Sequence, residues 1–172
     1  MKRHVLLIGL PGSGKTTVGR LVAERLQAGF VDVDAILGRR EGKPIAMIFA
    51  EKGEAAFRDM ERKEMDAALA SPPAVVAPGG GWAAHPGVIE RAKDRALVIF
   101  LCARAETAAQ RAAPEGTRPL LRGEDPVVRM RQLLRAREPF YRRAHAQVDT
   151  DRRSVEQVAG EVVRLAQSSA GW

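Results

Sequence analysis

The chain has 172 residues, of which 28 are basic and 21 acidic, and it carries a formal net charge of +7. This length suits one domain with a sizeable core. Its one cysteine, Cys102, excludes an internal disulfide and fits a reducing compartment, so we expect a cytoplasmic protein. No apolar run approaches the roughly 20 residues of a membrane-spanning helix, so we expect no membrane contact.

The positive charge is concentrated in residues 104–153, which hold 12 arginines and 7 acidic residues. Proteins that bind single-stranded nucleic acid combine basic residues with aromatic residues on which bases stack. Only 5% of this chain is aromatic. The charge therefore favours small polyanionic ligands, and we expect no nucleic-acid partner.

The first motif lies between an apolar run at 5–8, which predicts a buried strand, and the helical pattern of residues 17–27. It reads Gly9-Leu10-Pro11-Gly12-Ser13-Gly14-Lys15-Thr16 and matches the phosphate-loop pattern G-x-x-x-x-G-K-[ST]. Backbone N–H groups and the helix N-terminus would surround phosphate oxygens. Lys15 would reach the terminal phosphates and the Thr16 hydroxyl would ligate Mg²⁺. We therefore expect this stretch to bind a nucleoside triphosphate.

A second strand is expected over residues 30–34, and it ends in Asp32 and Asp34. Residues two apart in a strand point to the same side, so we expect both carboxylates on one side unless the strand has already turned. The end of this strand would lie at the sheet edge where ligands bind in open α/β folds. One carboxylate would help to hold Mg²⁺ through water, and the other would orient a substrate hydroxyl and accept its proton. A solvated turn without such a role is the alternative.

Strands and helices alternate along the rest of the chain. Short helical segments are expected around Gly42 and Pro44. Longer helices are expected over 54–70, 86–93, 105–113, 126–145 and 155–166, strands over 74–77, 96–101 and 147–149, and a frayed tail over 167–172. Five short strands with helical crossovers predict an α/β fold, a parallel sheet with helices on both faces, in a single domain over 1–172.

Two features of these elements indicate a second ligand. Gly79-Gly80-Gly81 follows a strand and would permit positive φ and a close approach of a ligand to the backbone, although an ordinary loop is the alternative. Arg137 falls on the apolar stripe of its helix with Met130, Leu133 and Tyr141. An inward-facing guanidinium needs an anionic partner. That partner is either a carboxylate of the protein or a bound carboxylate, which fits the planar fork.

Two other arginines are less informative by themselves. Arg58 lies between Glu54 and Glu61 at helical spacing, which is typical of a surface ion pair. Arg118 lies in 114–126, a stretch with three prolines and two glycines that we expect to be a mobile loop. Most loop arginines are solvated, but one beside a phosphate site would close over the transferring phosphoryl group.

Taken together, these residues resemble the shikimate kinases in order and spacing over nearly the whole chain. The motifs that carry the resemblance are 9–17, Asp32-Val33-Asp34, Phe57-Arg58 with Glu61, Gly79-Gly80-Gly81, Arg118-Pro119-Leu120-Leu121 and 137–141. The resemblance implies a five-stranded parallel sheet of order 2-3-1-4-5, as in nucleoside monophosphate kinases. It also implies transfer of the ATP γ-phosphoryl group to the 3-hydroxyl of shikimate.

The same resemblance implies a role for each site residue. The implied catalytic residues are Lys15, Asp34 and Arg118. ATP would be bound by Gly12, Ser13, Gly14, Lys15, Thr16, Thr17, Arg111, Arg118 and Arg153. Shikimate would be bound by Asp34, Arg58, Gly79, Gly80, Gly81 and Arg137, with the two arginines on its carboxylate. Thr16 and Asp32 would serve Mg²⁺, and Glu61 would orient Arg58. The apolar side of the pocket would be lined by Ile45, Phe49 and Phe57. Residues 33–61 would form the substrate-binding segment and residues 112–125 a lid, and we expect a monomer.

The sequence departs from the family pattern at three places. Val33 stands where a small hydroxyl residue is usual, Trp82 stands where a small residue is common, and no proline follows Arg153. Trp82 would alter the pocket rim.

Two alternative functions follow from other interpretations of the same motifs. A kinase of gluconate or another polyol acid need not share the pair Arg58 and Arg137, and a non-catalytic nucleotide-sensing or RNA-binding module would scatter its arginines over a surface.

Overall fold

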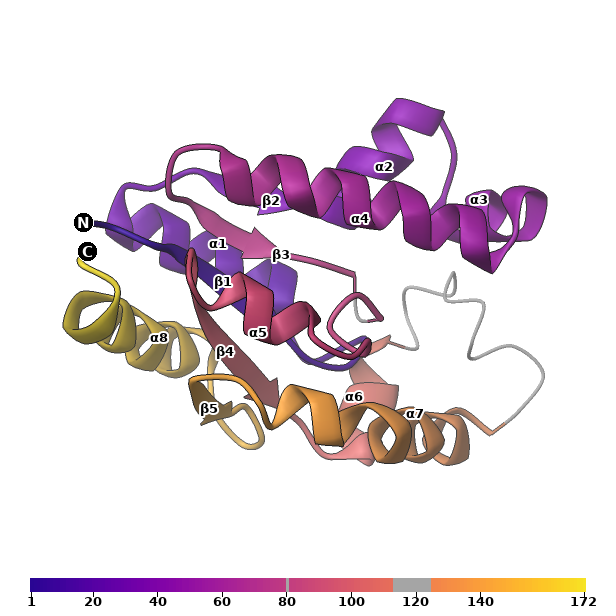
Figure 1. Ribbon diagram of the computed structural model, residues 1–172. Helices are drawn as coiled ribbons and strands as arrows, with labels where there is room; N and C mark the ends of the chain where they lie inside the picture. Colours follow the sequence, from indigo (N-terminus) through magenta and orange to yellow (C-terminus); the bar gives the residue numbers. More distant parts are fainter. Residues whose placement is uncertain (80, 113–124) are drawn as a thin grey trace.

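The fold is built around one parallel β-sheet, which a computed structural model describes with its helices for residues 1–79, 81–112 and 125–172 (Figure 1). The strands lie in the order β2-β3-β1-β4-β5, and every adjacent pair is parallel. This confirms the predicted sheet and strand order. The strands are β1 (His4–Ile8), β2 (Phe30–Asp32), β3 (Val75–Ala77), β4 (Ala96–Cys102) and β5 (Ala146–Asp149).

Helices cover both faces of this sheet. They are α1 (Lys15–Leu26), α2 (Val33–Glu41), α3 (Ile45–Lys52), α4 (Glu54–Ala70), α5 (Val88–Ala92), α6 (Ala105–Ala112), α7 (Pro126–Tyr141) and α8 (Val155–Ser169). Val5 and Leu7 of β1 belong to a core cluster shared with α1 and α8, whereas Leu6 and Ile8 belong to the cluster of the opposite face, shared with α4 to α7. This alternation is the period of two that a strand buried on both faces requires.

The topology brings three segments to one edge of the sheet. The carboxyl end of β1 leads into residues 9–14, that of β2 into α2, and that of β3 into residues 78–82. Because β3 pairs with both β1 and β2 in parallel, these ends lie side by side. Ligands of open parallel sheets bind at this edge.

Several predicted elements differ from the observed ones at their ends. β2 stops at Asp32, because the Asp32 carboxylate caps α2 by accepting a hydrogen bond from the Ala35 N–H at 3.1 Å. Asp34 therefore lies in the first turn of α2, so the strand has already turned before it and the two aspartates do not share a strand face. Likewise α7 ends at Tyr141, because the chain then turns so that His145 Nδ1 accepts a hydrogen bond from the Val98 N–H.

The C-terminal tail is packed, so the prediction that it frays was wrong. α8 continues to Ser169, and Ala170 is buried. The Trp172 indole N–H donates to the Arg3 carbonyl at 2.9 Å, and the Lys2 ammonium lies 4.5 Å from the ring centroid. These contacts join the two termini (Figure 1). Among the described residues, no helix has both the length and the apolar character to cross a membrane.

Candidate active site

The phosphate-binding loop connects β1 to α1, as its sequence context predicted. Gly12 has φ 77° and Gly14 has φ 96°, a conformation that favours glycine. A Cβ on Gly12 would also lie 2.3 Å from the Ala108 carbonyl oxygen of α6, so the loop packs directly against that helix. α1 begins at Lys15, and its N-terminus supplies the N–H groups and partial positive charge that bind phosphate.

Lys15 and Thr16 are already held in place at the start of α1. The Lys15 ammonium donates to the Gly9 carbonyl at 2.7 Å and the Leu10 carbonyl at 2.8 Å, and its side chain is almost fully buried. The Thr16 hydroxyl donates to Asp32 Oδ2 at 2.8 Å. A hydroxyl and a carboxylate side by side are hard oxygen ligands of the type that Mg²⁺ accepts. This pair therefore fits a magnesium ion that keeps some of its water.

A cavity of about 270 Å³ adjoins the loop. The predicted nucleotide residues Arg111 and Arg153 both line it. Arg111 donates to the hydroxyl and the carbonyl of Thr150, at 3.2 and 3.1 Å, and Arg153 forms an ion pair with Glu161 at 2.6 Å. The other lining residues are Gly12, Ser13, Gly14, Lys15, Thr16, Thr17, Val18, Thr150, Val155 and Val158. No sequence motif indicated Thr150, Val155 or Val158, which come from the C-terminal part of the chain.

A second cluster joins α2, α4 and the end of β3. The buried Glu61 accepts a hydrogen bond from Arg58 Nη1 through its Oε1 atom at 3.0 Å. Glu61 and Asp34 both face Gly79, because a Cβ there would lie 2.0 Å from Glu61 Oε2 and 2.9 Å from Asp34 Oδ1. Thus Asp34 and Arg58, predicted from distant segments, meet at one place. The Arg58–Glu61 pair is partly buried rather than the surface pair that its spacing alone favoured.

Arg137 faces inward from α7, as its helical phase predicted. Its side chain is only 7% exposed, and its Nη1 atom is buried without a hydrogen-bond partner among the described residues. One turn later on the same face lies Tyr141, whose hydroxyl donates to the Gly9 carbonyl at 3.3 Å. Burial raises the pKa of that phenol, whereas the nearby Arg137 guanidinium acts to lower it. Arg137 is therefore close to the phosphate loop, and its buried Nη1 is suited to receive an anion.

The charges of this second cluster act on one another. The pKa of Glu61 is raised to about 7; burial is the main cause and Asp34 contributes to the rise, while Arg58 and Arg137 oppose it. A carboxyl whose pKa is higher in the folded state favours folding when protonated. We therefore expect the free energy of unfolding to fall as the pH rises from about 4.5 to about 7, by at most roughly 3.4 kcal/mol.

This pH dependence can be isolated with Glu61→Gln, which keeps the shape of the side chain but does not titrate. Urea unfolding of both proteins at pH 5 and pH 8 measures the effect. The difference in unfolding free energy, variant minus wild type, should be more favourable to the variant at pH 8 than at pH 5. Other titrating groups contribute equally to both proteins and cancel in this difference. A difference between the two proteins that is the same at both pH values would contradict it.

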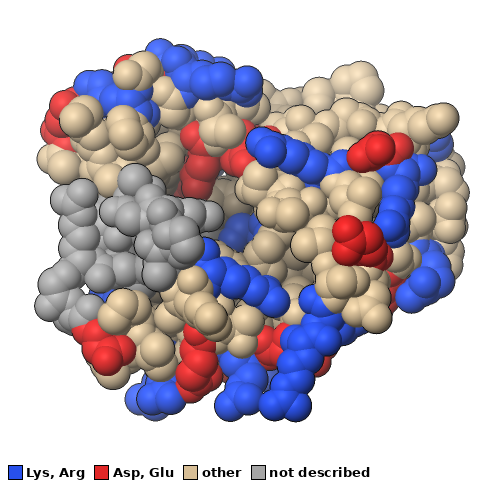
Figure 2. All heavy atoms as spheres, turned by 180° about the vertical axis from the view of Figure 1, so that it is seen from behind, with Lys and Arg blue, Asp and Glu red and all other residues tan. Residues whose placement is uncertain are grey.

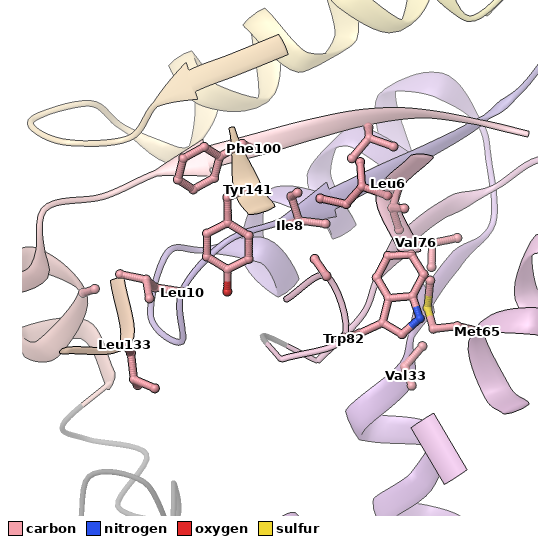
Figure 3. Packing of buried hydrophobic residues seen from close by; sticks show 14 of the residues in the cluster. Leu6, Ile8, Leu10, Val33, Met65, Val76, Trp82, Phe100, Leu133 and Tyr141 are labelled. Atoms are coloured by element: carbon pink, nitrogen blue, oxygen red, sulfur yellow. The ribbon is translucent and has the colours of Figure 1, made fainter. Parts of the chain in front are cut away.

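Some predicted site residues differ from what the sequence predicted, and others lie outside the described residues. Gly80 and Arg118 lie outside the described residues, as does the lid apart from Ala112 and Asp125. Gly79 and Gly81 do not use the positive φ that glycine permits. The Trp82 side chain packs in the core cluster with Met65 and Val76 (Figure 3), and it also lines a cavity of about 880 Å³ to which Arg58 and Glu61 contribute. It points inward because this side of the sheet offers apolar contacts to an indole.

The apolar residues expected beside the acceptor lie on α3 and α4. Phe57 is buried, and its ring centroid lies 5.5 Å from that of Phe49. Ile45 and Phe49 are partly buried and pack against the same core cluster. These contacts attach α3 to α4, the helix that carries Arg58 and Glu61.

Known proteins are similar to this chain in both sequence and fold. A family model described as shikimate kinase matches residues 11–167. The shikimate kinase of Symbiobacterium thermophilum is 43% identical over 167 residues, which cover 95% of this chain and 96% of the relative. That of Mycobacterium avium is 44% identical over 165 residues, covering 95% and 91% of the two chains.

A solved structure titled as shikimate kinase from Acinetobacter baumannii in complex with shikimate has a TM-score of 0.92 at 34% identity, and the match covers 98% of this chain and 94% of that one. A gluconokinase from Sinorhizobium meliloti, with a TM-score of 0.66 and 19% identity, shares the fold alone. The site geometry and these similarities agree. The chain belongs to the shikimate kinase family, whose members are ATP-dependent kinases.

Proposed function

We propose that the chain transfers the γ-phosphoryl group of ATP to the 3-hydroxyl of shikimate, giving shikimate 3-phosphate and ADP. The observation that carries this proposal is the buried Arg137 guanidinium, whose Nη1 atom lacks a hydrogen-bond partner among the described residues. Arg137 lies on the same helix face as Tyr141, which contacts the phosphate loop. An acceptor that carries both a carboxylate and hydroxyl groups matches Arg137, Arg58 and Asp34.

In the proposed mechanism, Arg58 and Arg137 hold the shikimate carboxylate, and Asp34 orients the 3-hydroxyl and accepts its proton. The hydroxyl oxygen bonds to the γ-phosphorus while the bond from that phosphorus to the bridging oxygen of ADP breaks. Lys15 and the loop N–H groups stabilise the charge on the phosphoryl oxygens. Arg118 would add a second cation there, a role that rests on its sequence motif.

We also propose which residues bind ATP and which bind Mg²⁺. Gly12, Ser13, Gly14 and Thr17 would contact the phosphates, and the cavity lined by Arg111 and Arg153 would hold the adenosine part. Thr16 and Asp32 would hold Mg²⁺ through a hydroxyl and water. When bound, that ion would neutralise charge on the phosphate oxygens.

The wider setting of the enzyme is also a proposal. We expect residues 1–172 to form one domain, with substrate-binding segment 33–61 and lid 112–125, and to act as a monomer in the cytoplasm. The view in Figure 2 supports the absence of a nucleic-acid partner, because basic side chains on that face are interspersed with acidic ones. Ion pairs such as Arg131–Glu106 and Arg143–Glu90 neutralise part of the basic C-terminal half.

The release of ADP tests the proposed reaction. Enzyme and Mg·ATP would be assayed with shikimate, with gluconate and with no acceptor. We expect release well above the acceptor-free rate with shikimate only, because gluconate lacks the ring that fixes its hydroxyls relative to its carboxylate. Equal rates with shikimate and without an acceptor would refute the proposal, and a faster rate with gluconate would favour the related kinase.

A further inference from the structure

Gly79 and Gly81 follow β3, yet their backbones do not need glycine. Neither φ falls in the left-handed region where glycine is favoured. What each position lacks is room for a side chain. At Gly79 a Cβ would lie 2.0 Å from Glu61 Oε2, and at Gly81 it would lie 2.4 to 2.6 Å from three atoms of the Arg58 guanidinium. The two glycines therefore lie against the two members of one ion pair.

The contact at Gly81 determines how Arg58 is oriented. Nη1, Cζ and Nη2 of Arg58 are nearly equidistant from the Cβ position, so the flat face of the guanidinium lies on the glycine. One edge of the group is used by Glu61, which accepts from Nη1. With one face covered and one edge bonded, the guanidinium has a fixed plane, which is what bidentate binding of a carboxylate requires.

The contact at Gly79 fixes Glu61 itself. α4 cannot shift to make room, because Phe57, Met65 and Ala68 on the same face are all buried in the core. The carboxyl group has only its own torsion angles with which to avoid an added methyl group. Oε2 of Glu61 has no hydrogen-bond partner among the described residues. It occupies the space that a side chain at residue 79 would fill, so it can lie there only because that residue is glycine.

We propose that Gly79 and Gly81 are positioning residues for acceptor binding, because the space that their missing side chains leave holds Glu61 and Arg58 in the orientation that captures the acceptor's carboxylate. This inference rests on the proposed function and deepens it. In this inference the two glycines contribute to specificity for an anionic acceptor by orienting the Arg58–Glu61 ion pair. This effect is separate from any contact between their backbone and the ligand.

Steady-state kinetics of Gly81→Ala test the proposal most directly. The added methyl group should push the partly exposed Arg58 toward solvent without unfolding the protein. We expect KM for shikimate to rise at least about tenfold, as for the loss of a hydrogen bond to a charged group. KM for ATP should stay within about twofold, as should KM for the uncharged methyl ester of shikimate. The matched control is Gly29→Ala, where a Cβ would meet only Ala74, at an ordinary 3.8 Å.

Gly79→Ala is tested with a compensating change. Its acceptor KM should also rise, and adding Glu61→Asp, which shortens the clashing side chain by one methylene, should recover at least about threefold of the loss. Unchanged KM for shikimate in Gly81→Ala would overturn the proposal, and so would equal rises for shikimate and its ester. If Gly79→Ala does not fold, Gly81→Ala decides the question.

One measurement needs no acceptor and so separates this inference from the proposed function. In Gly79→Ala the displaced Glu61 carboxyl becomes more hydrated, so the loss of unfolding free energy between pH 5 and pH 8 should shrink relative to wild type. If wild type does not phosphorylate shikimate, the proposed function fails, whereas an unaltered pH dependence in a folded Gly79→Ala overturns the positioning role of that glycine.

Discussion

Replacing Lys15 with alanine is expected to lower kcat by about 10²- to 10³-fold, the usual effect of removing one group that stabilises transition-state charge. The Lys15 ammonium is the cation that the described residues place within the phosphate loop, on the carbonyls of Gly9 and Leu10. Once the nucleotide binds, these weak acceptors would be exchanged for phosphate oxygens. The loss should therefore appear in turnover rather than in KM for shikimate, for which we propose other binding residues.

The assay for this variant is ADP release at saturating substrates, with the melting temperature measured in parallel. Lys63→Ala on the exposed surface of α4 is the control for loss of a lysine, because its ammonium forms a surface ion pair with Asp59. It should keep wild-type kcat. A Lys15→Ala enzyme that is folded and turns over within tenfold of wild type would remove Lys15 from the proposed mechanism.

Replacing Arg137 with lysine is expected to raise KM for shikimate by roughly 10- to 150-fold. An ammonium keeps the charge but cannot offer two parallel N–H donors to a carboxylate, and a hydrogen bond to a charged group contributes about 1.5–3 kcal/mol. The site is buried, so water cannot replace the lost donor at little cost. KM for ATP should change little.

Arg135→Lys is the matched control, since it makes the same substitution on the same helix at an exposed position. Its kinetic constants should equal those of wild type. The methyl ester of shikimate provides a second comparison, because its KM should be nearly the same for wild type and Arg137→Lys. An unchanged KM for shikimate in Arg137→Lys would show that Arg137 makes only structural contacts, for instance with Tyr141.

The parts of the candidate site that the sequence predicted are those whose structure is determined by residues close together in one segment. The phosphate loop was recognisable because its glycines, lysine and threonine lie within eight residues, between a strand and a helix. Arg137 was recognisable because the period of the helix relates it to the buried Met130, Leu133 and Tyr141. Asp34 was identified, but it was placed on a strand, since the sequence did not reveal that Asp32 caps the following helix.

The alternation of apolar strands and helices determined the α/β class, and the motifs determined the phosphate loop. Only the tertiary structure decided what lies beside it. Thr150, Val155 and Val158 reach the nucleotide cavity because β5 and α8 close that side of the sheet. Glu61 is buried, with a pKa near 7, because α4 packs across the end of β3. Solvation, charge and steric space depend on residues far apart in the chain, whereas propensity and periodicity depend on neighbours.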